Sequence, residues 1–476
     1  MFSPRSDNPS TFDLQPPTYN IRKRVLFVTY YFPPSGGPGV QRALKLVKYL
    51  PRFGWQPTVL TVRPGAAAFP DRDETLLGDV PESVRVERTA AWDPYALYAR
   101  LLGKEKSDAV SVGFIGEEAP GWRERLSRWL RANVVLPDAR VGWVPFAAAR
   151  AGKLLQEDPF DALITTGPPH STHLAGLLLA RFTGVAWTAD FRDPWTDISY
   201  YQQLPTTAPA RRLDRAVERA VLRRAHRVTA VNPRLGQLLE SKTTSDGGAP
   251  VHVIRNGFDP DDFSEQPHSD ETKGEASVEE ADEQQQEALP FVLAHVGSLT
   301  ASQDPHALWE ALQRLRERDT VPELRIRMVG NLDGAVRQSL RRRGLDDVLE
   351  TVPYVPHAEA VGFMEKASLL VLCINRTERA ESITPGKTYE YVATGQPVLG
   401  LGPPEGDAAK VLRTSGAGRM FAHDDSEGVA RFLEEHLRAW EAGAPRRGAA
   451  PEDADRFSRR RQAKQLSALM NRLSDS

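Results

Sequence analysis

Residues 25–62 read VLFVTYYFPPSGGPGVQRALKLVKYLPRFGWQPTVLTV and decide the fold of the first half of the chain. Val25–Tyr30 is an almost unbroken apolar, β-branched and aromatic run, typical of a strand buried on both faces of a parallel sheet. The loop PPSGGPG follows, and a segment with apolar residues at helical spacing then ends at Gly54, which suits a helix C-cap. Residues 55–62 contain the next strand. This unit predicts the opening of a doubly wound α/β domain.

The same alternation of strand and helix continues to about residue 255, and a second series begins with the strand Phe291–Val296. We therefore predict the fold class α/β, with two tandem Rossmann-like, doubly wound domains that face each other across a cleft. Ligands of such sheets bind where the carboxyl ends of the strands meet a crevice. The cleft is thus the expected site.

We predict five regions along the chain. Residues 1–20 form a polar, proline-rich disordered tail, and residues 21–255 form the first domain. Residues 256–290 form a hinge and a disordered insert, because 264–290 holds nine acidic residues and one lysine and has little to bury. Residues 291–445 form the second domain. Residues 446–476 are expected to be a C-terminal helix that returns to the first domain.

The composition excludes several classes of protein. The 476 residues carry a formal net charge of −2, which does not fit a dedicated nucleic-acid binder. The single cysteine, Cys373, excludes an internal disulfide framework and a zinc site with several cysteines. No apolar run approaches the ~18 residues that span a bilayer, and the first 20 residues lack the apolar core of a signal peptide. We expect a cytoplasmic protein.

The segment Ser382–Tyr391, SITPGKTYEY, carries the most chemistry. It follows a predicted strand, and Pro385 suits the first turn of the helix that it begins. The backbone N–H groups of Gly386–Thr388, together with the Lys387 ammonium, are placed to form a diphosphate site, and the alternative interpretation is an ordinary helix start with a surface lysine and glutamate. Glu390, one turn further on, is placed to accept hydrogen bonds from a ribose diol.

At this point the chain resembles glycosyltransferase family 4, the retaining enzymes of GT-B fold, in a bacterial polysaccharide or glycolipid branch. YEYVATGQPVLG, residues 389–400, resembles the donor-site helix and strand of that family. Six other segments resemble landmarks of the family and occur in the family's order. They are the opening strand and glycine loop, TTGPPHSTHLAG (165–176), TADFRDPW (188–195), VIRNGFDPDDF (253–263), HVGSL (295–299) and RMVGN (327–331).

The resemblance implies transfer of a sugar from a nucleotide-diphosphate sugar to an acceptor hydroxyl, with retention and without a required cofactor or metal. It implies His170, His173 and Lys387 as catalytic residues, and Asp190, Arg192 and Asp193 as acceptor-side residues. The donor-binding residues that it implies are Gly36, Gly37, Gly297, Ser298, Gly330, Pro385, Gly386, Lys387, Thr388, Tyr389 and Glu390. Asp190 and Arg192 have a second interpretation, in which they simply pair with each other.

The chain departs from the family pattern in two places. Ser382 stands where the family has the first glutamate of a pair, with Glu381 beside it. Residues 298–303 hold no cation, although the family often places Arg and Lys there, so Lys387 must neutralise more of the diphosphate, helped by Arg376 or Arg379. A sugar-nucleotide epimerase, a catalytically weak sugar-nucleotide-binding protein and a nicotinamide oxidoreductase remain alternatives.

Two further motifs concern metals and membranes. Asp71-Arg72-Asp73 has the DxD form of metal-dependent transferases, but it lies in the wrong domain, and we expect no metal. The basic, aromatic segment 122–131 and the arginine-rich helix 210–226 suit an anionic membrane surface, and the alternative interpretation is an ordinary solvated helix with one packed face. Expected partners are a nucleotide sugar and a saccharide or lipid-linked acceptor, with peripheral contact at the inner membrane face.

Overall fold

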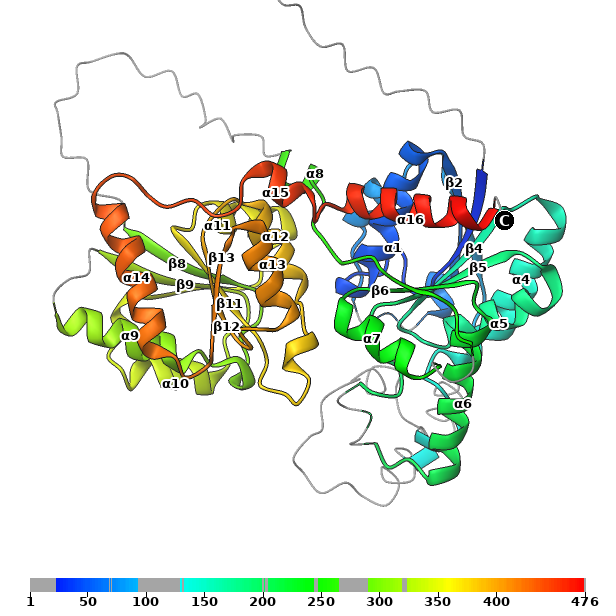
Figure 1. Cartoon of the computed structure of the whole chain (residues 1–476), viewed down its shortest axis with the longest axis horizontal. Coiled ribbons are helices and arrows are strands. Elements are labelled where there is room, and N and C mark those ends of the chain that lie inside the picture. The colour runs from blue at the N-terminus through cyan, green and yellow to red at the C-terminus, as the bar shows by residue number, and fades with distance from the viewer. Residues whose placement is uncertain are drawn as a thin grey trace, which may run out of the picture.

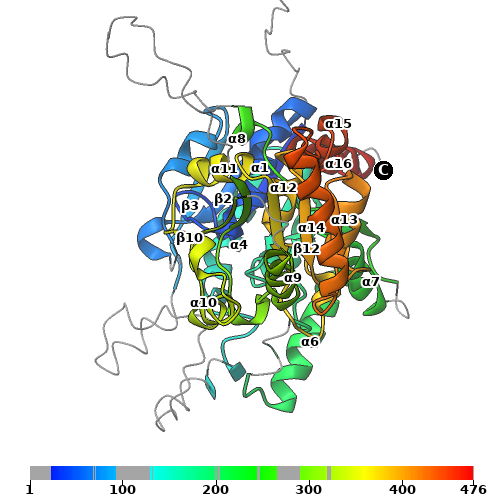
Figure 2. The same cartoon turned by 90° about the vertical axis from the view of Figure 1, so that its left-hand side faces the viewer.

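The structure, a computed structural model, describes residues 23–67, 69, 71–92, 129–130, 132–198, 201, 204–243, 247–264, 290–318 and 323–474. Three segments singled out in the sequence lie outside this part of the chain: the expected tail at 1–20, the acidic insert from residue 265 to 289, and segment 122–131 except residues 129–130. Two α/β domains lie side by side, the first drawn from blue to green and the second from yellow-green to orange (Figure 1). Figure 2 shows the second domain end-on, in front of the first.

The first domain is built on a parallel sheet with the order β3-β2-β1-β4-β5-β6-β7. Its strands are β1 (Lys23–Val28), β2 (Trp55–Val62), β3 (Arg85–Thr89), β4 (Ala162–Gly167), β5 (Ala186–Phe191), β6 (Arg227–Ala230) and β7 (Val251–Val253). Its helices are α1 (Pro38–Tyr49), α4 (Val144–Glu157), α5 (Thr172–Thr183), α6 (Ala208–Arg224) and α7 (Pro233–Ser241). Buried apolar clusters cover both faces of the sheet, as expected where helices flank parallel strands.

The second domain repeats this plan with the strand order β10-β9-β8-β11-β12-β13. Its strands are β8 (Phe291–Val296), β9 (Leu324–Val329), β10 (Leu349–Val352), β11 (Leu369–Cys373), β12 (Val398–Leu401) and β13 (Gly418–Phe421). Its helices are α9 (His306–Glu317), α10 (Gly334–Arg341), α11 (His357–Glu365), α12 (Gly386–Ala393), α13 (Asp407–Ser415) and α14 (Ser426–Glu441). The two sheets confirm the predicted pair of doubly wound domains.

Some elements differ from the sequence pattern. The first strand runs from Lys23 to Val28, two residues earlier than its apolar run, because its ladder with β2 starts by pairing Lys23 with Trp55. The edge strand β3, RVERT, did not stand out because its charged side chains remain half-exposed. Gly54 has the left-handed φ of 80° that ends the turn after α1.

The chain crosses between the domains twice. After β7 it passes through α8 (Asp261–Ser264), and after α14 it returns through α15 (Pro451–Asp455) to α16 (Arg459–Ser474). Helix α16, red in Figure 1, packs on α1 of the first domain, where Ala463, Leu466 and Met470 join the buried cluster. The last helix thus belongs to the core of the first domain. Among the described residues, no helix has both the length and the apolarity needed to cross a bilayer.

Candidate functional site

Two glycines shape the carboxyl edge of the second sheet. Gly297 follows β8 with φ 105°, and Gly330 follows β9 with φ 111°. A Cβ atom on Gly330 would lie 3.1 Å from the Gly297 carbonyl carbon, so the two strand ends approach more closely than side chains would allow. Ser298, next to Gly297, is exposed. The absence of side chains therefore lets the two strand ends pack closely at this edge, where Ser298 stays exposed.

Helix α12 begins beside this edge. Its N-cap is Pro385, and its first residue, Gly386, has no atom within 4 Å of an added Cβ, so its backbone is accessible. The Thr388 side chain is buried, and its Oγ1 has no hydrogen-bond partner within the described part of the chain. Backbone N–H groups at such a helix start attract an anion.

Lys387 extends from α12 over Gly297. Its Nζ lies 3.1 Å from Nε2 of His295, and a Cβ on Gly297 would be only 2.8 Å from Nζ. Burial lowers the pKa of Lys387. Burial, and then the charge of Lys387, lower the pKa of His295 to about 3, so the imidazole is neutral. Sequence reasoning missed His295, although it stands in the quoted HVGSL motif.

Glu390 lies one turn further along α12, with its side chain 28% exposed. Its Oε1 is 3.9 Å from Nε2 of His357, which in turn lies 3.4 Å from Oδ2 of Asp262. Burial raises the pKa of Glu390. The hydrogen bond with Asp262 raises the pKa of His357. The carboxylate is thus oriented from one side and open on the other.

The two tyrosines of α12 point into the domain. Tyr389 is 1% exposed and packs near Phe457, so at this position only the backbone can face a ligand. The Oη of Tyr391 accepts a hydrogen bond of 2.9 Å from the Val296 backbone N–H. This bond fixes the end of β8 against α12.

The glycine loop of the first domain lies between β1 and α1. Gly37 caps α1 with φ 82°, and the Gly36 N–H donates to the Asp71 carbonyl over 2.9 Å. A Cβ on Gly36 would lie 3.2 Å from the Cβ of Asp73. The DxD segment therefore packs against the glycine loop.

His170 and His173 come together behind the end of β4. His173 is fully buried, stacks on Phe191, and has its Nδ1 2.9 Å from Oγ1 of Thr165. His170 is 8% exposed and stacks on Trp195 at 9°. Burial lowers the pKa of both, to about 3 for His173. His170 is therefore the less completely buried of the two.

Asp190 lies within the sheet and pairs with Arg42, which the sequence analysis did not single out. The Nε and Nη2 of Arg42 lie 2.9 and 2.8 Å from its two carboxylate oxygens, and Thr166 and Thr229 donate to the same oxygens over 2.8 and 2.5 Å. Burial opposes ionisation, but Arg42 outweighs it and lowers the pKa of Asp190 to about 2. All these bonds are internal.

Arg192 and Asp193 differ from Asp190. Arg192 donates to the backbone carbonyls of Gly39, Gly167 and Pro168, and so ties the loops after β1 and β4 together. Asp193 is half-buried, and burial raises its pKa. Within the part of the chain that the structure describes, its carboxylate makes no hydrogen bond, so it is available to a ligand.

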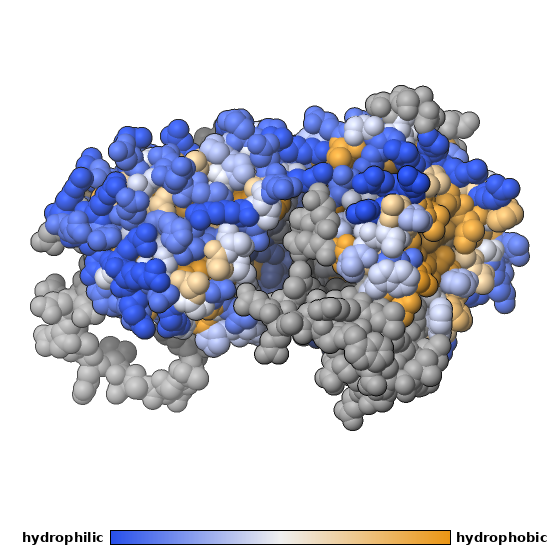
Figure 3. Space-filling view, turned by 90° about the horizontal axis from the view of Figure 1, so that it is seen from below, coloured by the Kyte–Doolittle hydropathy of each residue, from blue (hydrophilic) through white to orange (hydrophobic). Residues whose placement is uncertain are grey.

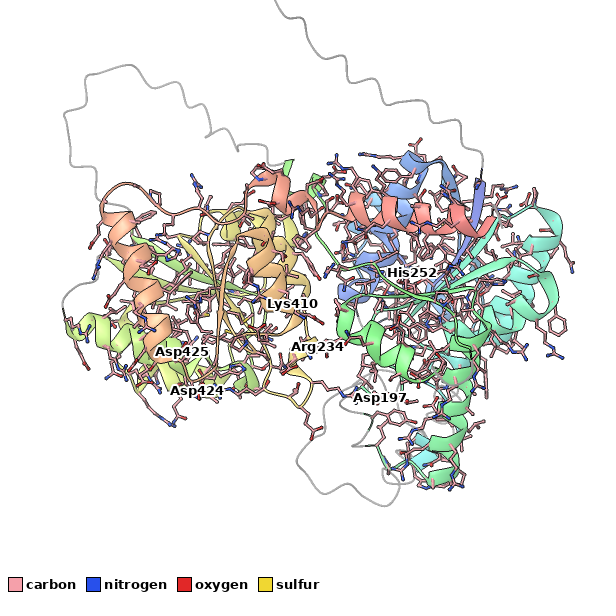
Figure 4. The ribbon with its side chains drawn as sticks, in the orientation of Figure 1. Asp197, Arg234, His252, Lys410, Asp424 and Asp425 are labelled. Carbon is pink, nitrogen blue, oxygen red and sulfur yellow. The ribbon has the colours of Figure 1, made fainter. Side chains whose placement is uncertain are left out.

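Polar contacts join the two domains. Asn232 donates to the Ser382 carbonyl over 2.9 Å, Arg234 pairs with Glu381 at 2.6 Å, and Arg379 pairs with Asp197 at 3.1 Å. Figure 4 shows Arg234 and Asp197 on the side of the first domain that faces the second. Glu381, beside the serine that departs from the family pattern, is therefore engaged across the domain boundary.

One carboxylate cluster of the described chain has a spacing that suits a metal ion, namely Asp79, Asp259 and Asp262. The Lys45 Nζ lies 2.7, 2.6 and 3.1 Å from these three side chains. The ammonium thus stands where a cation would be, and the cluster is a set of ion pairs at the start of the hinge.

Two family models match the chain in sequence, one in each domain. Residues 112–262 match a model described as Glycosyltransferase Family 4, and residues 290–439 match Glycosyl transferases group 1. No curated protein matches the chain in sequence.

Solved structures share the fold. Sucrose-phosphate synthase from Thermosynechococcus elongatus is 15% identical with a TM-score of 0.56, covering 95% of this chain and 99% of that one. A Rickettsia africae glycosyltransferase is 12% identical with a TM-score of 0.55, covering 96% and 99%. Anabaena HepE, solved in complex with UDP and glucose, is 15% identical with a TM-score of 0.53, covering 95% and 100%.

The two matched regions together span more than half of the chain, one in each domain. The chain belongs to the glycosyltransferases of family 4 and group 1, with the GT-B fold, and the predicted family is confirmed. It is a transferase that moves a sugar from a nucleotide sugar.

Proposed function

We propose that a nucleoside-diphosphate sugar binds at the carboxyl edge of the second sheet, and that its sugar passes with retention to an acceptor held by the first domain. The observation that carries this proposal is Lys387 at the start of α12, with its ammonium over Gly297 and Glu390 one turn away. A cation and a helix N-terminus stabilise the negative charge that develops on the leaving diphosphate. Glu390 would accept the ribose hydroxyls.

On the first domain, we propose that His170 and Asp193 line the acceptor side. His170 retains 8% exposure, and the Asp193 carboxylate is half-buried without a hydrogen bond among the described residues. Arg192 and the buried His173 would hold these groups in place through the loops after β1 and β4. The reaction needs no resident metal, since Lys387 and α12 supply the positive charge.

The donor site is tested by calorimetric titration with UDP, GDP, ADP and their sugars, alongside NAD and NADP. We expect one nucleoside diphosphate to bind, with affinity lost in Lys387→Ala and Glu390→Ala. The matched control is Lys410→Ala, on the neighbouring helix α13, where the side chain is 42% exposed (Figure 4). Binding of NAD alone, or equal affinity in all variants, would exclude the site. The anomeric configuration of the product, read by NMR, tests retention.

A protein that binds sugar nucleotides but transfers weakly is the second candidate. It is favoured by Ser382, since its neighbour Glu381 is held by Arg234 and not directed at the sugar. Donor binding at normal affinity without sugar release to any acceptor or to water would identify it.

We further propose that the acceptor is carried on a lipid, and that α6 rests on the inner face of an anionic membrane. The helix exposes six arginines: Arg211, Arg212, Arg215, Arg219, Arg223 and Arg224. Its two carboxylates, Asp214 and Glu218, are each 1% exposed and bonded inward to Tyr201 and Lys242. The outward face of α6 is therefore basic along its length.

Apolar side chains protrude beside these arginines. Leu213 on α6 and Leu178 and Phe182 on α5 are 57%, 46% and 78% exposed, and α5 packs on α6. Figure 3 shows apolar residues gathered on the outer side of the first domain. Arginines with protruding apolar side chains suit a membrane interface, at about 1 kcal/mol for each arginine near anionic lipid.

Vesicle sedimentation tests this surface. We expect binding to vesicles that contain phosphatidylglycerol, no binding to pure phosphatidylcholine, and a loss of at least about tenfold in Arg211→Glu with Arg215→Glu. The control reverses two exposed arginines of the second domain, Arg337→Glu on α10 with Arg342→Glu at the C-terminal cap of that helix. Equal binding by both double variants would refute this orientation.

A further inference from the structure

His295 is a buried histidine whose two ring nitrogens are both occupied. It stands near the end of β8 and is 1% exposed. Its Nδ1 lies 2.9 Å from the Val371 carbonyl, and its Nε2 lies 3.1 Å from the Lys387 ammonium and, further away, 3.4 Å from the Ser298 carbonyl, so the shorter Val371 contact decides the position of the ring proton. The Val371 carbonyl can only accept a hydrogen bond, so Nδ1 carries the proton and Nε2 presents its lone pair. Lys387 therefore donates to a neutral imidazole.

The partner of Lys387 is unusual for a buried lysine. Lys45 in the first domain shows the common solution, since three aspartates lie within 3.1 Å of its ammonium and neutralise it. For Lys387, no carboxylate in the described chain comes within ion-pair distance. An imidazole orients the ammonium without cancelling its charge.

The surroundings fix the position of this ammonium. The Nζ atom stands over Gly297, where a Cβ would be 2.8 Å away. The Val296 N–H is held by the Oη of Tyr391, so the strand end cannot shift away from α12. An ammonium has three N–H groups. One is used by His295, and two remain for a ligand at the carboxyl edge.

We propose that His295 is a positioning residue, which directs the Lys387 ammonium toward the diphosphate of the donor without neutralising it. This inference rests on the proposed diphosphate role of Lys387. His295 does not touch the ligand. It acts through the lysine, and its effect is confined to ligands that carry the phosphates that the lysine reaches.

The test compares ligands with and without a diphosphate. Dissociation constants for UDP, GDP and ADP, and for the matching nucleosides, are measured by calorimetry on wild type, His295→Ala, His295→Gln and His295→Glu. Glutamine offers an acceptor oxygen near the place of Nε2, so we expect affinity within about threefold of wild type. We expect about tenfold weaker diphosphate binding for alanine and about a hundredfold for glutamate, which would neutralise the lysine. Nucleoside affinity should not change.

A double-mutant cycle with Lys387→Ala separates this inference from the function on which it rests. In the Lys387→Ala background, we expect His295→Ala to change diphosphate affinity by less than about twofold. An equal loss in both backgrounds, or a parallel loss of nucleoside affinity, would overturn the positioning role. Unchanged affinity in Lys387→Ala, or no diphosphate binding by wild type, would instead overturn the proposed donor site. His252→Gln, on β7 of the first domain, is the control.

Discussion

Replacing Asp190 by asparagine removes a charge that holds the first domain together. The carboxylate is 3% exposed and accepts bonds from Arg42, Thr166 and Thr229. Arg42 also donates to the carbonyls of Ile254 and Arg255, so this ion pair links α1, β5 and the segment that leaves β7. Without the carboxylate, the guanidinium is left buried with carbonyl partners and no compensating charge.

The size of the effect follows from this burial. Removal of one partner from a buried ion pair costs about 3–5 kcal/mol, because the remaining charge is uncompensated. For a domain of this size, that cost lowers the unfolding temperature by roughly 6–20 °C. Thermal unfolding of Asp190→Asn, followed by circular dichroism, measures it. We expect the unfolding temperature to fall by the same amount with and without nucleotide.

The neighbouring Asp193→Asn is the matched control. Its carboxylate makes no hydrogen bond among the described residues, so we expect a shift in unfolding temperature below about 2 °C. Its effect should instead appear in the acceptor KM. If Asp190→Asn unfolds within about 2 °C of wild type and raises the acceptor KM, then Asp190 is an acceptor-side residue. In that case its ion pair with Arg42 does not stabilise the domain by the expected amount.

Three further expectations follow from described contacts. The pKa of Asp190 is about 2 when folded, below its value of about 3.9 when unfolded, so its stabilisation is complete above about pH 4 and is lost as the pH falls toward 2. Thermal unfolding should therefore show a gap between wild type and Asp190→Asn that is constant from pH 8 to 5 and closes below pH 4. Gly297→Ala places a Cβ against the Lys387 ammonium and should weaken diphosphate binding at least about tenfold by calorimetry. Gly344→Ala, where φ is also positive at 64° but the added Cβ meets open space, should leave it unchanged. Glu381→Ala breaks an ion pair between side chains that are 35% and 55% exposed, so urea unfolding should show a loss below about 1 kcal/mol.

The sequence predicts the two sheets because their strands are apolar runs that stand out locally. Trp55–Val62 and Phe291–Val296 appear in the structure as the pattern indicates. The role of Arg42 was not predictable, because its partner Asp190 lies 148 residues away in the sequence. The helical pattern alone places Arg42 on the polar face of its helix. His295 is 92 residues from Lys387. Such contacts depend on which strand ends meet, and this is decided by the packing of the whole sheet.

The position of His295 also answers the question raised by the missing cations after β8. Residues 298–303 hold none, and the two arginines expected to help are engaged elsewhere. Arg376 donates to the Asp304 carbonyl over 3.3 Å, and Arg379 pairs with Asp197 at 3.1 Å. Lys387 and the start of α12 therefore supply the positive charge on the donor side. A carboxylate partner would fix that lysine but cancel its charge, whereas a buried neutral histidine fixes it and leaves the charge for the leaving group.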